Sequence, residues 1–64
     1  MLVNLVTPKH ETVIVNTEDI STITDGAVGG FSRIAFISGD KPITVIGTPQ
    51  EIYDDIMNKM KGDE

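Results

Sequence analysis

The segment from Gly47 to Met60 constrains the fold most, because helix-start chemistry and helical periodicity coincide only there. Thr48 stands where an N-cap belongs, and Pro49 follows at the first helical position, where a missing N–H costs nothing. Glu51 can complete a capping box by accepting a hydrogen bond from the backbone N–H of Thr48. We therefore predict one helix over this segment.

Apolar side chains recur at helical spacing after this cap. Ile52, Ile56 and Met60 follow one another at intervals of four residues, which places them in one stripe along the helix. The other side carries the charged residues Asp54, Asp55 and Lys59. We predict that the stripe is buried against a sheet and that the charged side stays exposed.

Five short β-rich runs precede this helix. They are Leu2–Thr7, Thr12–Asn16, about Ile20–Asp25, Phe31–Ser38 and Ile43–Ile46. Pro42 is expected at the first position of the last strand, where it removes little from the hydrogen-bond ladder. Short links favour antiparallel neighbours, and Asn16 or Thr17 can cap a short turn between the second and third runs. The predicted fold class is therefore α+β: a small curled antiparallel sheet of four to five strands with one C-terminal helix packed on it, in a single domain spanning residues 1–64.

Length and charge restrict the possible partners. A chain of 64 residues without cysteine has no disulfide and no thiolate metal site, so a partner subunit is one way to add burial. Ten acidic and five basic residues give a net charge of −5, which repels nucleic acid and anionic membranes. No apolar run approaches the roughly 20 residues that span a bilayer. We expect a cytoplasmic protein with no nucleic-acid partner and no membrane insertion.

No group of residues typical of catalysis stands out. His10 is the only histidine, and it lies in a predicted turn without the second histidine or clustered carboxylates that a metal or a nucleophilic site needs. Asp54 and Asp55 are adjacent, so a helix points them apart and they cannot share a proton. We therefore expect no enzyme, no metal and no cofactor.

The glycine-rich segment Gly26–Gly30 is the best candidate for a ligand site, because glycines let backbone N–H groups converge on an anion. The candidate ligand-binding residues are Gly26, Gly29, Gly30 and Arg33, the only arginine. The spacing matches no phosphate-binding motif, and a strand follows it. The competing interpretation is a mobile hairpin loop followed by an exposed arginine opposite Glu18 or Asp19.

Four stretches together resemble a known family. Within Val13–Ile23, the part from Asn16 to Ile23 fits Asn-x-x-x-Ile-x-x-Ile at the start of a strand, and Ile34–Gly39 follows as strand and turn. Ile43–Ile46 then leads to Pro49–Ile52, which fits a closing strand and a helix beginning x-x-Glu-Ile. This order resembles the small FlbD-type flagellar proteins.

The resemblance implies a cytoplasmic, non-enzymatic accessory protein linked to motility, with no catalytic residues to carry over. The chain departs from the family pattern at the Gly26–Gly30 loop, which is longer, and at Gly47-Thr48, which replaces an acidic-serine helix start. A short acidic chain is equally typical of bacteriophage or mobile-element proteins that bind one host protein.

The absence of catalytic groups favours a protein-binding or self-assembling accessory module. Apolar residues occupy both faces of the predicted strands, more than one helix can cover, so a partner polypeptide or a second copy is expected to cover the rest. A small-ligand binding module that uses the Gly26–Gly30 loop is the alternative.

Overall fold

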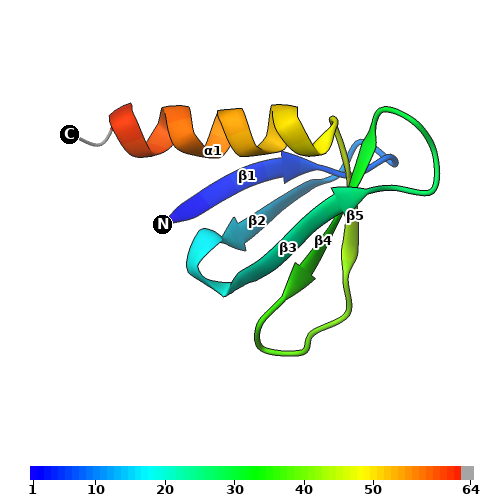
Figure 1. The fold of residues 1–64 in the computed structure, drawn as a ribbon, viewed down its shortest axis with the longest axis horizontal. Helices are drawn as coiled ribbons and strands as arrows, with labels where there is room; N and C mark the ends of the chain where they lie inside the picture. Colours follow the sequence, from blue (N-terminus) through cyan, green and yellow to red (C-terminus); the bar gives the residue numbers. More distant parts are fainter. Residues whose placement is uncertain (63–64) are drawn as a thin grey trace.

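The structure, a computed structural model, describes residues 1–62 and has the α+β architecture that the sequence predicts (Figure 1). The elements in that range are β1 (Leu2–Val6), β2 (Thr12–Asn16), the short 3₁₀ helix η1 (Thr17–Asp19), β3 (Ile20–Asp25), β4 (Phe31–Phe36), β5 (Ile43–Ile46) and α1 (Pro49–Gly62). The elements agree with the predicted runs to within two residues at the ends of the strands.

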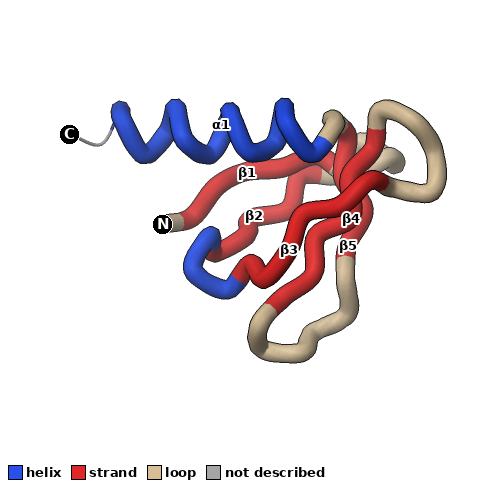
Figure 2. Tube along the Cα trace, viewed as in Figure 1, coloured by secondary structure: helices blue, strands red, loops and turns tan. Residues whose placement is uncertain are grey.

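The five strands form two antiparallel sheets, so a single curled sheet is not confirmed. One sheet is the hairpin β1–β2, and the other has the order β3-β4-β5. The chain passes from β2 to β3 through η1, drawn as the short blue segment between two red strands in Figure 2. Asn16 caps this turn, because its side chain accepts a hydrogen bond from the N–H of Glu18 at 3.1 Å. The turn redirects the chain, so β2 and β3 do not pair.

A small apolar core lies where the two sheets and the helix meet. Its buried side chains are Val3, Leu5, Val15, Ile34, Val45, Ile52 and Ile56. Alternation along the strands explains the strand members of this set, since every second residue points to the same face, and the spacing of four residues explains Ile52 and Ile56 on α1. The helix packs against β3 and β4, and β1 lies close to β5. The core therefore joins the two sheets although no strand ladder does so among the described residues.

The predicted helix cap is confirmed, but the predicted burial of Met60 is wrong. Ile52 and Ile56 are buried, and Asp54, Asp55 and Lys59 are exposed as expected. Met60 is 43% exposed. Figure 1 shows the reason, because the C-terminal turns of α1 extend past the start of β1 and have no strand beneath them.

The link between β4 and β5 is longer than the sequence suggests. β4 ends at Phe36 instead of continuing to Ser38, because the chain turns at Gly39, which has φ +88° and donates its N–H to the carbonyl of Phe36 at 3.3 Å. β5 begins at Ile43, so Pro42 lies before the strand and not at its first position. This link flanks the cavity described next.

Candidate binding site along the open edge of β2

Two hydrogen bonds fix which backbone groups of β2 face away from β1. The N–H of Thr17 donates to the carbonyl of Met1 at 2.8 Å, and the N–H of Thr7 donates to the carbonyl of Glu11 at 2.9 Å. These contacts lie at the two ends of a hairpin whose register is uninterrupted from Leu2–Asn16 to Val6–Thr12. Antiparallel pairs alternate between bonded and non-bonded positions, so Val15 and Val13 are the bonded residues of β2.

Ile14 consequently turns both of its backbone groups toward the open edge of β2. In the described part of the chain, no backbone hydrogen bond outside the strand ladders involves Ile14. Thr12 and Asn16 lie two residues before and after Ile14, so their backbone groups also face this edge. An unpaired N–H and C=O at the edge of a sheet can bond to another strand.

The edge of β2 carries none of the features that usually prevent strand pairing. Its sequence is Thr-Val-Ile-Val-Asn, without lysine, proline or any charged residue. Its register with β1 shows no bulge, whereas β3 has a register shift between Ile20 and Thr22. Proteins commonly protect sheet edges with lysine, proline or bulges. β2 is therefore an unprotected edge.

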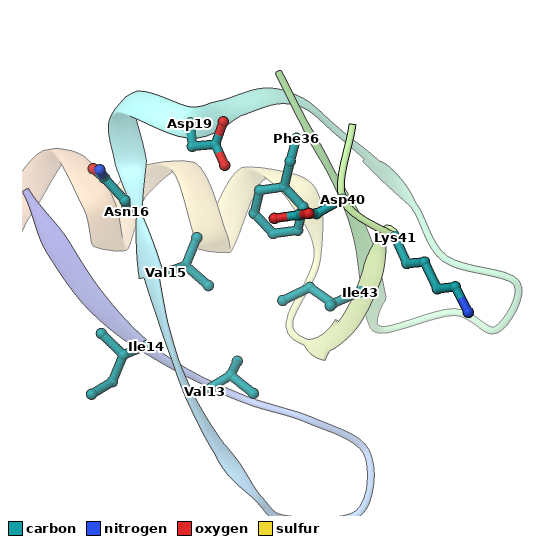
Figure 3. Close-up of a pocket in the computed structure, with 9 residues that line it drawn as sticks. All are labelled: Val13, Ile14, Val15, Asn16, Asp19, Phe36, Asp40, Lys41 and Ile43. Carbon is teal, nitrogen blue, oxygen red and sulfur yellow. The ribbon is translucent and has the colours of Figure 1, made fainter. Parts of the chain in front are cut away.

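A cavity of about 330 Å³ follows this edge between β2 and the facing ends of β4 and β5 (Figure 3). Its lining residues are Val13, Ile14, Val15, Asn16, Asp19, Phe36, Asp40, Lys41 and Ile43. Four of them are successive residues of β2, and side chains alternate along a strand, so the cavity runs along the edge and not over one face. Its volume suits one or two side chains of a partner.

The floor of the cavity is apolar. In Figure 3, Val13 and Val15 lie on the side of β2 that faces Phe36 and Ile43, and Ile14 lies on the opposite side. Val15 is buried in the core, and Val13, Phe36 and Ile43 are partly buried against it. A partner side chain placed here would be removed from water by four apolar residues.

Asp19 closes the cavity at the end nearest η1. Its two carboxylate oxygens accept hydrogen bonds from the N–H and the hydroxyl of Ser38, each at 3.0 Å. The backbone adds a further bond, from the N–H of Ile37 to the carbonyl of Asp19 at 2.7 Å. These contacts hold the end of β4 against η1 at one end of the cavity, and its long side remains open.

The other described cavity, of about 430 Å³, borders β1 instead of β2. It lies between β1, β5 and the start of α1, and it includes the core residues Leu5 and Ile52. The outward edge of β1 faces Ile46 of β5 across it. β5 therefore lies closer to the edge of β1 than to the edge of β2.

The structure does not bring the predicted ligand-binding residues into either cavity. Gly26 donates its N–H to the carbonyl of Phe31 at 2.9 Å, and the carbonyl of Gly30 accepts from Gly47 at 2.8 Å. Gly29 has open space around it. This segment is a loop, as predicted, and ligand binding by Gly26, Gly29 and Gly30 stays a prediction.

Arg33 is exposed in the middle strand of the three-stranded sheet. Its neighbours across the ladders are Thr24 on β3 and Thr44 on β5, so the expectation that it lies opposite Glu18 or Asp19 is wrong. The cause is the position of η1, which precedes β3 and so places both acids near the opposite end of β4.

Among the described residues, no group of three or more histidine, cysteine or acidic side chains lies close enough to hold a metal ion. The polar groups around the cavity along β2 are one amide, two carboxylates and one ammonium, with no histidine or hydroxyl among its lining residues. The arrangement offers a cavity with an apolar floor and charged side chains around it, beside the free backbone groups of β2.

Sequence reasoning predicted the strand but not the cavity. The uncharged run Thr12–Asn16 is a visible signal of an unprotected edge, and strand alternation places Val13 and Val15 on one face without indicating which face is inward. The contributions of Asp19, Phe36 and Ile43 depend on the turn made by η1, which sets how far the two sheets stand apart. That distance has no local sequence signal.

No family model, curated protein or solved structure matches this chain. Within residues 1–62, no helix is both long enough and apolar enough to cross a membrane.

Proposed function

We propose that this protein is a non-enzymatic module that binds a polypeptide by strand addition to β2. One observation carries the proposal: both backbone groups of Ile14 face an uncharged, unpaired edge that borders a cavity with an apolar floor. Strand addition takes its affinity from main-chain hydrogen bonds and its specificity from pockets for alternate side chains. The edge of β2 supplies the main-chain hydrogen-bonding groups, and the cavity lined by Val13, Phe36 and Ile43 supplies the side-chain pocket.

Exposed apolar side chains near the edge support this function. Leu2 is 68% exposed and Ile14 is 67% exposed. They are diagonal neighbours on the outer face of the hairpin, because Ile14 pairs with Asn4 and Leu2 stands two residues before Asn4. A partner strand beside β2 would extend this face and cover part of both side chains.

The resemblance to the FlbD-type proteins supports a role as a cytoplasmic accessory protein linked to motility. The same binding mode serves the alternative of a bacteriophage protein that binds a host protein. Both roles require a polypeptide partner and neither requires catalysis.

Site-specific photo-crosslinking in the native host tests the proposal. A benzophenone amino acid replaces Ile14 in one variant and Tyr53, which is 54% exposed on α1, in a matched control. Polypeptide adducts are expected at position 14 and not at position 53. Equal labelling at both positions, or no adduct at position 14, would show that the edge of β2 does not bind a polypeptide.

A further inference from the structure

We propose that the strand added to β2 is β2 of a second copy of this chain, paired antiparallel about a twofold axis at Ile14. This inference rests on the proposed function and names its partner. It follows from the parity of the edge, from the charge pattern of the hairpin and from the small core.

The free backbone groups of β2 are arranged symmetrically. Thr12, Ile14 and Asn16 face the open edge, and Ile14 is the middle one. A twofold axis at this point makes Ile14 exchange both backbone hydrogen bonds with Ile14 of the partner subunit. The same axis places Thr12 opposite Asn16 of the partner subunit. β2 can therefore pair with β2 of the partner subunit in a symmetric register, as a twofold interface requires.

The local charge pattern of the hairpin is compatible with a second copy. Two chains of net charge −5 repel each other at long range, so a contact between copies is least opposed where the surface carries no charge. The outer face of the hairpin is such a surface, consisting of Leu2, Asn4, Val6, Thr12, Ile14 and Asn16. Its polar groups are amides and a hydroxyl, which both donate and accept hydrogen bonds and so can complement copies of themselves.

The pairing would bury the most exposed apolar residues of the hairpin. Ile14 and Ile14 of the partner subunit would become directly opposed neighbours on the outer face. Leu2 flanks Ile14 diagonally on each side, so the four side chains would form one continuous apolar row. On the inner face, Val13 and Val15 of the partner subunit would extend toward the cavity lined by Phe36 and Ile43.

The interface is a small one. A single strand pair with its side chains falls at or below the usual lower limit of about 1,200 Å² for stable complexes. We therefore expect a weak dimer, with a Kd of roughly 10–100 μM. A chain of 64 residues with a small core gains burial from such pairing.

Charge reversal at the axis gives a specific test. Ile14→Glu and Ile14→Lys each place two like charges together in the dimer, whereas an equimolar mixture places opposite charges together. In sedimentation velocity up to about 1 mM, the native chain should dimerise, each variant alone should remain monomeric, and the mixture should recover a heterodimer. Val28→Glu and Val28→Lys, at an exposed position in the Gly26–Gly30 loop, are the matched controls and should dimerise like the native chain.

The outcomes separate this inference from the proposed function. A native chain that stays monomeric up to about 1 mM overturns the inference. Dimers that persist in Ile14→Glu alone also overturn it, because the contact then lies elsewhere. If the inference fails while photo-crosslinking at position 14 still yields an adduct heavier than two copies of the chain, the proposed function stands with a different partner.

Discussion

Thr48 and Glu51 exchange two hydrogen bonds at the start of α1. The N–H of Glu51 donates to the hydroxyl of Thr48, and the N–H of Thr48 donates to the Glu51 carboxylate, each at 3.2 Å. This capping box satisfies two N–H groups that the first turn of a helix would otherwise leave unpaired. It also fixes where the helix begins, and so places Ile52 over the core.

Loss of this cap should weaken the fold measurably. Thr48→Ala removes the hydroxyl that accepts from Glu51, and we expect it to lower the free energy of unfolding by about 1 kcal/mol. Thr48→Ser keeps the hydroxyl and should remain close to the native value. Urea denaturation of both variants checks this, and equal losses would show that the methyl group matters rather than the hydrogen bond.

Ile56 and Met60 should differ sharply although they lie on the same stripe of α1. Ile56 is 7% exposed in the core, so Ile56→Ala should cost on the order of 2–5 kcal/mol. Met60 extends past the sheets, so Met60→Ala should cost no more than about 0.5 kcal/mol. Chemical denaturation of the two variants is the measurement. Similar losses would mean that the last turns of α1 pack against something in solution.

Two glycines should respond in opposite ways to alanine. Gly47 has φ +120°, and an added Cβ would lie 3.1 Å from Cδ1 of Ile52, so Gly47→Ala should cost about 1–3 kcal/mol. Gly29 has open space around it and no positive φ, so Gly29→Ala should stabilise the fold by about 0.4–1 kcal/mol through the unfolded chain. Thermal and urea unfolding of the pair tests the assignment of Gly47 as the conformationally required glycine.

Local chemistry made much of this fold predictable from the sequence. The cap at Thr48 and the turn capped by Asn16 depend on residues within three positions of each other, and both are observed. Strand alternation places Val13 and Val15 on one shared face, and both lie on the core side in the structure.

The relations between distant elements were not predictable in this way. The division into two sheets depends on how η1 directs the chain, and the exposure of Met60 depends on how far the strands reach beneath α1. The position of Arg33 between two threonines depends on the register of β4, which the surrounding loops set. Each of these results from packing, so no short stretch of sequence encodes it.

Proline substitutions at neighbouring positions of β2 test the parity on which the binding site depends. Val13 donates its N–H into the ladder with β1, so Val13→Pro removes a hydrogen bond and should cost about 3 kcal/mol or more. The N–H of Ile14 faces the open edge, so Ile14→Pro loses no bond within the chain and should cost clearly less, as prolines at sheet edges do. Denaturation measures both losses, and sedimentation should show that Ile14→Pro is monomeric at concentrations where the native chain dimerises. A larger loss for Ile14→Pro than for Val13→Pro would reverse the assigned parity, because Ile14 would then bond to β1 and the open edge would belong to Val13 and Val15.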